Sequence, residues 1–243
     1  MEKYNLDHID IVVSHKCNMH CFCCIDKFRG IVDGEIELAS VVNFLKKIRT
    51  VTGERLEVLF LGGEPTIIGA KKNIELANLI RSYGFSPIMS SNGVRKDIIN
   101  EILPYFDWIQ ITTHSEKETE YWREVNKKFN NINLKLSGDK QLTYDKLMHF
   151  IETTKDFKRR SVSMYFTPNF EQLCKDEKIW DMLKTLDWKI NGSYKYAFYK
   201  DVRFKKCIPG ITNIADEPTV PKLYPNGNYN KTWLNEENDD YLK

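Results

Sequence analysis

Four of the six cysteines in this 243-residue chain lie within residues 17–24, directly after an apolar stretch. Three of them, Cys17, Cys21 and Cys24, have the spacing C-x3-C-x2-C. Thiolates held this close repel one another unless a metal centre shares their charge, and sulfur ligands select zinc, Cu(I) or an iron–sulfur cluster. Three cysteines do not close a four-ligand cage. If a four-iron cluster binds here, one iron is left open for a ligand that is not protein.

Two histidines beside these cysteines, His15 and His20, make a zinc site the main alternative. Structural zinc sites usually combine two sets of closely spaced ligands, and the sequence offers no second set. Cys174 and Cys207 stand alone and are expected to be ordinary residues. The cysteine pattern therefore favours an iron–sulfur cluster, and only one.

The elements that must position these cysteines follow a strand–helix rhythm repeated six times. Hydrophobic periodicity predicts strands at 6–13, 56–61, 87–90, 108–113, 131–136 and 161–167. It predicts helices at 36–48, 71–83, 97–103, 116–128, 144–157 and 179–186. Such alternation indicates an α/β fold of parallel strands with right-handed crossovers, short of the eight units of a closed barrel. A partial, open barrel and a doubly wound sheet both fit.

The pattern changes near residue 190, so we expect residues 1–190 to form the barrel and 191–243 a C-terminal extension without a further cluster. A seventh strand is predicted at 194–199. From Pro209 onward the chain is rich in Pro, Asn and Gly, which predicts extended coil. This coil is expected to form a strap across the open edge or mouth of the barrel, or to fray beyond about residue 235.

Composition limits the partners. The net charge is +2 and no basic block occurs, so charge indicates neither nucleic acid nor a membrane surface. The N-terminus lacks a signal-peptide profile, and no apolar run approaches the ~18 residues that span a bilayer. We therefore expect a cytoplasmic protein with reduced cysteines and no membrane partner.

Polar clusters follow the predicted strands at the points where they end. The cysteines follow the first strand, and residues 62–65, 90–93, 112–114 and 137–139 follow the next four. Parallel α/β sheets place their sites at the carboxyl ends of the strands. We therefore expect these clusters to share one rim and form a single site.

The combination resembles the radical S-adenosylmethionine superfamily. The cysteine motif, Gly62-Gly63-Glu64-Pro65 and Ser91-Asn92-Gly93 occur in the expected order, and the resemblance covers about residues 6–190. It implies a partial (β/α)6 open barrel in which Cys17, Cys21 and Cys24 hold one [4Fe–4S] cluster. The open iron would bind S-adenosylmethionine, whose reductive cleavage gives a 5′-deoxyadenosyl radical that removes hydrogen from a substrate.

The resemblance also implies roles for the residues after the second strand. Gly62 and Gly63 would let the backbone approach the methionine amino group, where a side chain would block it. Glu64 would support that ammonium group, and Pro65 would fix the turn. Without the cysteines, this motif would be read as a plain strand-to-helix turn.

Further cofactor contacts are implied along the rim. Ser91 and Asn92 resemble residues near the ribose or the methionine carboxylate, although Ser-Asn-Gly is also a common turn. Thr112 is similar in position to ribose or substrate contacts. Lys135 would bind the carboxylate if it faces the barrel interior, and solvent if it faces outward. Cys23 replaces an aromatic residue that family members often carry beside adenine, and we assign it as a small apolar filler rather than a ligand.

Candidate catalytic residues are His114, Asp139 and Tyr165, which follow or end the later strands. His114 is the best-placed histidine for substrate, although a surface histidine at a helix start is a competing interpretation. Tyr and Phe are dense between residues 194 and 204, and they form either a flat pocket wall or the buried face of a strand.

Three functions remain open at this stage. The first is an enzyme of lyase or oxidoreductase type acting on a small molecule, for example a nucleobase or deazapurine. That choice rests on the compact length, which resembles the small radical enzymes of deazaguanine biosynthesis and queuine salvage. The second is a peptide- or protein-modifying enzyme, including a glycyl-radical activase. The third is a non-catalytic iron–sulfur or zinc regulatory protein. Either enzyme would need an electron donor such as flavodoxin or ferredoxin.

Overall fold

The structure is a computed structural model that describes residues 8–21, 34–51, 56–138, 143–158, 160–164, 178 and 222–230. The fold is α/β, with helices alternating with parallel strands in a sheet that stays open and does not close into a full barrel. The prediction of an open partial barrel is thereby confirmed. The chain divides into two compact units, Met1–Gln110 with Asp216–Lys243, and Ile111–Ala215.

The first unit holds most of the sheet. Its elements are β1 (His8–Ser14), α1 (Leu38–Val51), β2 (Glu57–Gly62), the 3₁₀ helix η2 (Pro65–Ile68), α2 (Gly69–Ser82), β3 (Ser86–Ser91), α3 (Lys96–Ile102), the 3₁₀ helix η3 (Leu103–Tyr105), β7 (Lys222–Leu223) and β8 (Tyr229–Asn230). Its strands lie in the order β3-β2-β1-β7-β8. Strand β4 (Trp108–Thr113) crosses the boundary between the units.

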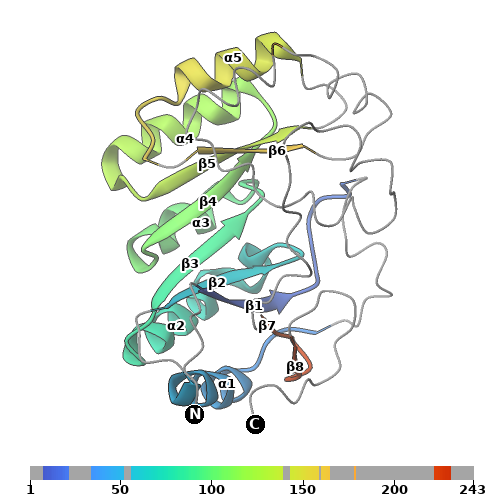
Figure 1. Cartoon of the computed structure of the whole chain (residues 1–243), viewed down its shortest axis with the longest axis vertical. Coiled ribbons are helices and arrows are strands. Elements are labelled where there is room, and N and C mark those ends of the chain that lie inside the picture. The colour runs from blue at the N-terminus through green and yellow to red at the C-terminus, as the bar shows by residue number, and fades with distance from the viewer. Residues whose placement is uncertain are drawn as a thin grey trace. The chain divides into compact units, whose positions relative to one another are not determined.

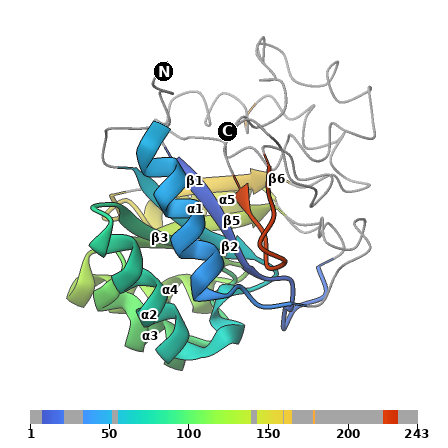
Figure 2. The same ribbon diagram turned by 90° about the horizontal axis from the view of Figure 1, so that it is seen from below.

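The core of the first unit lies between the sheet and its helices. In the parallel pairing of β1 with β2, Ile11 is opposite Phe60, and both side chains are fully buried. The ring of Phe60 meets that of Phe106, which follows η3, edge to face at 5.1 Å between centroids. Figures 1 and 2 show α1, α2 and α3 along one face of β1–β3. Ile11 and Phe60 therefore point towards this helical layer.

The opposite face of β1 carries a buried ion pair. Asp10 alternates with Ile11 and so lies on the face away from the helices. It is in register with Lys222 of β7, and Lys222 Nζ lies 3.1 Å from Asp10 Oδ2. The side chains are 1% and 6% exposed for Lys222 and Asp10 respectively. Strand β7, although only two residues long, is thus attached to the centre of the first unit.

Residues 222–230 form a small antiparallel hairpin, β7 with β8, that packs on α1. The Lys47 ammonium donates to the hydroxyl of Tyr229 at 2.6 Å, and the Tyr229 ring lies 5.9 Å from that of Phe44. Gly227 has φ +83, and a β-carbon on it would lie 3.1 Å from Ser40 Oγ on α1. The sequence pattern gave no sign of these strands within the segment predicted as coil.

The second unit begins with the end of β4 and continues with α4 (Glu116–Phe129), β5 (Ile132–Gly138), α5 (Tyr144–Thr153) and β6 (Arg160–Met164). Strands β5 and β6 pair in parallel. Helix α4 begins at a Ser115 N-cap, whose hydroxyl accepts from the N–H of Glu118, and ends at Asn130 in the left-handed conformation.

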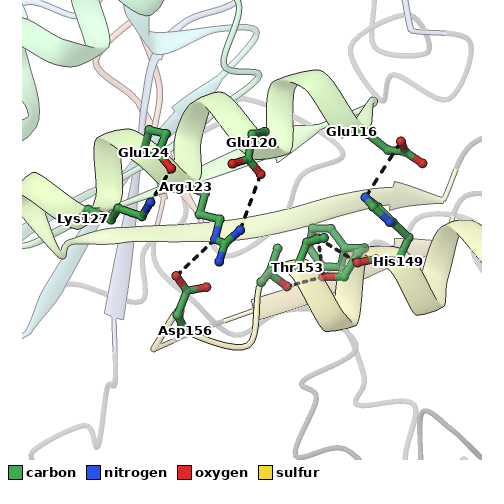
Figure 3. A network of polar contacts seen from close by, with 10 residues as sticks. Glu116, Glu120, Arg123, Glu124, Lys127, His149, Thr153 and Asp156 are labelled. Atoms are coloured by element: carbon green, nitrogen blue, oxygen red, sulfur yellow. Dashed lines mark hydrogen bonds and ion pairs between the residues drawn. The ribbon is translucent and has the colours of Figure 1, made fainter.

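Polar contacts join α4 to α5 and to the turn that follows it (Figure 3). Arg123 of α4 lies 3.7 Å from Glu120 and 3.4 Å from Asp156, and His149 of α5 lies 3.9 Å from Glu116. These are partly exposed side chains, so each pair contributes at most about 1 kcal/mol. In the same region burial lowers the pKa of the Arg160 guanidinium, an effect that nearby Asp156 opposes.

Most predicted elements are present within a few residues of their expected bounds. One exception is α5, which ends at Thr153 and not at residue 157. The hydroxyls of Thr153 and Thr154 bond to the carbonyls of His149 and Phe150, a side-chain alternative to the helical pattern. The predicted helix at 179–186 and strand at 194–199 lie outside the described residues. Within the described residues, no helix is long and apolar enough to cross a membrane.

Candidate active site

The end of β2 is bonded directly to the segment that leads into the cysteines. The N–H of Gly63 donates to the carbonyl of Ser14 at 2.8 Å, and the N–H of Glu64 donates to the carbonyl of Lys16 at 2.9 Å. Cys17 is the next residue after Lys16. The Gly-Gly-Glu sequence therefore fixes the backbone beside the first cysteine of the motif.

This close approach explains both glycines. A β-carbon on Gly62 would lie 2.2 Å from the Ser14 carbonyl oxygen, and Gly62 also has φ +132. A β-carbon on Gly63 would lie 2.4 Å from the carbonyl oxygens of both His15 and Lys16. Any other residue would push the cysteine segment away from β2. The sequence argument expected these glycines to make room for a methionine amino group, and the structure gives them an additional, structural reason.

Glu64 is a buried acid, 1% exposed, whose carboxylate joins the ends of β2 and β3. Its Oε1 accepts from the backbone N–H of Thr66 at 3.1 Å, the Thr66 hydroxyl at 2.7 Å and the Ser91 hydroxyl at 2.8 Å. Its Oε2 accepts from the backbone N–H of Asn92 at 2.7 Å. Four donors stabilise a buried carboxylate, and Oε2 retains the capacity to accept one further hydrogen bond.

The side chain of Asn92 connects β3 to the cysteine segment. Its Nδ2 lies 2.7 Å from Asn18 Oδ1 and 3.8 Å from Cys17 Sγ. Its Oδ1 accepts from the backbone N–H of Val94 at 3.0 Å. The backbone N–H of Met19 also donates to Cys17 Sγ, at 3.4 Å. Two N–H donors at one sulfur favour its thiolate form, which is the form that binds metal.

The described residues therefore fit a cluster site as far as they reach. Cys17 and Cys21 are both half-buried, and Cys17 is held by the contacts above. Cys23 and Cys24 lie outside the described residues, so the third ligand and the apolar role of Cys23 remain predictions. Soft sulfur donors with N–H groups directed at one of them suit an iron–sulfur cluster.

In the second unit, the two threonines that end β4 point in opposite directions. Thr113 is fully buried, and its hydroxyl accepts from that of Thr119 on α4 at 3.3 Å. Because successive side chains alternate along a strand, Thr112 lies on the face away from α4. Thr112 is half-buried there, and it is the one of the pair that the sequence argument assigned to the cofactor.

The remaining candidates lie later in the chain. The backbone N–H of His114 donates to Glu118 Oε2 at 2.8 Å, which places this residue at the start of α4. Lys135 is half-buried on β5, on the face opposite to fully buried Leu134. Asp139 and Tyr165 lie outside the described residues.

Two residues of the network were missed by sequence reasoning. Thr66 follows Glu64 by two positions, a spacing at which an acidic side chain often accepts from the backbone at a helix start, so a local signal was present. Asn18 directly follows Cys17, and no sequence pattern indicates that it meets Asn92 from β3.

Comparison with known proteins gives one family. The family model described as the Radical SAM superfamily matches residues 11–185. A comparison with curated protein sequences finds no significant match.

Several solved structures share the fold. The structure "Native anSMEcpe with bound AdoMet and Kp18Cys peptide" has a TM-score of 0.64 at 14% identity, covering 93% of this chain and 74% of that one. A second, with a Cp18Cys peptide, has a TM-score of 0.62 at 14% identity, covering 95% and 74%. For a histidine-tagged anSMEcpe with bound AdoMet the values are 0.56 and 16%, covering 75% of this chain and 63% of that one. This chain thus spans between 63% and 74% of the length of those chains.

Proposed function

We propose, from the premise that this chain belongs to the radical SAM superfamily, that the strand ends of its first unit bind a [4Fe–4S] cluster and S-adenosylmethionine for reductive cleavage. Members of this superfamily are enzymes. The observation that carries the proposal is the connection of three strand ends: Glu64 after β2 bonds Asn92 after β3, and Asn92 reaches Cys17 after β1. The three motifs that carry the resemblance are therefore joined by hydrogen bonds.

The proposed cluster ligands are Cys17, Cys21 and Cys24, with Cys23 excluded. When bound, the cluster and S-adenosylmethionine supply one-electron cleavage of a carbon–sulfur bond, giving methionine and a 5′-deoxyadenosyl radical that removes hydrogen from substrate. The protein's part is to hold both groups in a fixed orientation and to exclude water.

Glu64 is the residue whose geometry best supports a cofactor role. Oε2 accepts a single hydrogen bond, from the N–H of Asn92, and so keeps an acceptor site for the methionine ammonium group. Three donors on Oε1 keep the carboxylate from turning away. We propose that Glu64 orients the ammonium, with Gly62, Gly63 and Pro65 shaping the turn around it.

The other contacts are proposed on the resemblance. Ser91, Asn92 and Thr112 are assigned to the ribose or the methionine carboxylate, and Lys135 to that carboxylate. His114, Asp139 and Tyr165 are assigned to the substrate. A cytoplasmic location and a flavodoxin or ferredoxin donor are proposed from the sequence alone.

For the substrate we propose a small molecule, of which a nucleobase or deazapurine processed by a lyase is the specific instance. The second candidate is a peptide. It is favoured by the similarity over 93–95% of this chain to structures that hold a cysteine-containing peptide beside AdoMet. At 14% identity this similarity shows the fold alone, so the two candidates must be separated by experiment.

Metal content tests the ligand assignment. Alanine is introduced singly at Cys17, Cys21, Cys24 and Cys23, and iron and sulfide are measured after anaerobic reconstitution. We expect the first three variants to lose the cluster and Cys23→Ala to keep it. Equal losses in all four would contradict the assignment, and zinc without sulfide in the parent protein would support a structural zinc site.

Hydrogen transfer tests the substrate. The reconstituted protein is incubated with S-adenosylmethionine, a reductant and deuterated candidates, both deazapurines and cysteine-containing peptides. Deuterium in 5′-deoxyadenosine identifies the class whose C–H bond is broken. Transfer from the peptides and not from the deazapurines would replace the first proposal with the second.

A further inference from the structure

We infer that Asn92 is a positioning residue for the cluster, whose side-chain amide donates to the sulfur of Cys17 and raises the reduction potential of the bound cluster. The inference rests on the proposed function, in which Cys17 binds an iron. Asn92 Nδ2 lies 3.8 Å from Cys17 Sγ and 2.7 Å from Asn18 Oδ1. An amide nitrogen carries two hydrogens, so one can be directed at each acceptor.

The orientation of this amide is set by its other contacts. Asn92 Oδ1 accepts from the backbone N–H of Val94 at 3.0 Å. A flipped amide would place an NH2 group against that N–H and an oxygen against Asn18 Oδ1, losing both hydrogen bonds. The nitrogen, and not the oxygen, must therefore face Cys17.

The backbone of Asn92 is held as firmly as its side chain. Its N–H donates to Glu64 Oε2 at 2.7 Å, and the same carboxylate accepts from the Ser91 hydroxyl. Glu64 is 1% exposed, so these bonds lie out of contact with competing water. The amide that faces the cysteine is thus anchored in two strand ends, and its position does not depend on a freely rotating surface side chain.

Donors at cluster sulfurs affect electron affinity. Reduction adds a negative charge that is shared with the ligand sulfurs, and an N–H dipole directed at a sulfur stabilises that charge. The backbone N–H of Met19 and the amide of Asn92 both reach Cys17 Sγ. Of these two donors, only the amide can be removed by changing a side chain. Its removal should make the cluster harder to reduce.

The test compares Asn92→Asp and Asn92→Ala with the parent protein. Asn92→Asp keeps the shape and the acceptor for Val94 but replaces the donor with a negative charge, whereas Asn92→Ala removes the donor without adding charge. Asn78→Asp, at an exposed position of α2, is the matched control for added charge. After reconstitution, iron and sulfide are measured, and the reduced cluster is quantified by electron paramagnetic resonance at a series of set potentials without S-adenosylmethionine.

At the potential that reduces half of the parent cluster, we expect the ratio of reduced to oxidised cluster to fall about tenfold in Asn92→Asp, equivalent to about 59 mV for a one-electron couple. The fall should be smaller in Asn92→Ala and absent in Asn78→Asp. Unchanged ratios in both Asn92 variants would overturn the inference, and so would loss of the cluster from both, since Asn92 would then serve binding and not potential. A parent protein that binds no cluster would instead refute the proposed function.

Discussion

At Gly63, one added β-carbon would lie 2.4 Å from two carbonyl oxygens, those of His15 and Lys16. No side chain can move aside to relieve these contacts, because both belong to the backbone that leads into Cys17. The effect of substitution should therefore reach the cluster site through the position of the cysteine segment. Gly63 has no positive φ, so this clash is separable from backbone strain.

We predict that Gly63→Ala lowers the free energy of unfolding by about 1–3 kcal/mol and sharply reduces iron binding, because the cysteine segment must shift. Gly69→Ala is the matched control. Gly69 has φ +82 but nothing within 4 Å of an added β-carbon, so the change should cost about 1–2 kcal/mol of strain and leave iron content intact. Equal iron contents in the two variants would contradict the prediction.

Glu64 supports a second prediction at this scale. Glu64→Gln would turn an NH2 group towards the Thr66 or Asn92 N–H donors that the carboxylate now accepts from. A buried donor left facing a donor costs about 1–3 kcal/mol, which denaturant unfolding should detect. Glu75→Gln, exposed on α2, should leave stability unchanged. Similar midpoints for both variants would show that the Glu64 network does not hold the strand ends together.

Individual site residues could be predicted by type but not by contact. The motif placed Glu64, Ser91 and Asn92 at neighbouring strand ends, and the structure joins them by hydrogen bonds. The contact between Asn18 and Asn92 could not be predicted, because it spans 74 positions and depends on the exact turn after each strand. Strand alternation alone was enough to separate Thr112 from Thr113.

Among the elements, β7 is the one whose position depends most on a single interaction. It is two residues long, yet Lys222 is buried beside Asp10 of β1 at 3.1 Å. Sequence could not indicate it, because two residues in a Pro- and Asn-rich segment show no periodicity. The six longer strands were found because each carries several apolar residues in a period that a strand requires.

We predict that Lys222→Met costs about 3–5 kcal/mol in unfolding free energy, because it leaves the Asp10 carboxylate buried without its cation. Adding Asp10→Asn removes that charge, so the double variant should be more stable than Lys222→Met alone. Lys47→Met is the matched control: its partner Tyr229 is in the same hairpin, but the contact is exposed, and its loss should cost about 1 kcal/mol or less. A double variant that is no more stable than the single one would contradict this account.

For the whole molecule, the sequence was sufficient for the class of fold and of chemistry. Strand–helix alternation predicted an open α/β barrel, and three motifs at successive strand ends predicted the superfamily whose model matches residues 11–185. The substrate could not be predicted, because its contacts lie late in the chain, where single tyrosines and acids carry no pattern. Asp139 and Tyr165 remain predictions for that reason.

The most direct test of the account is the fate of S-adenosylmethionine itself. Anaerobically reconstituted protein is mixed with S-adenosylmethionine and a strong reductant, and 5′-deoxyadenosine and methionine are quantified by liquid chromatography. The account predicts both products in equal amounts from the parent protein, and neither above background from Cys17→Ala or Cys21→Ala. A parent protein that carries its cluster and yet forms no 5′-deoxyadenosine would contradict it.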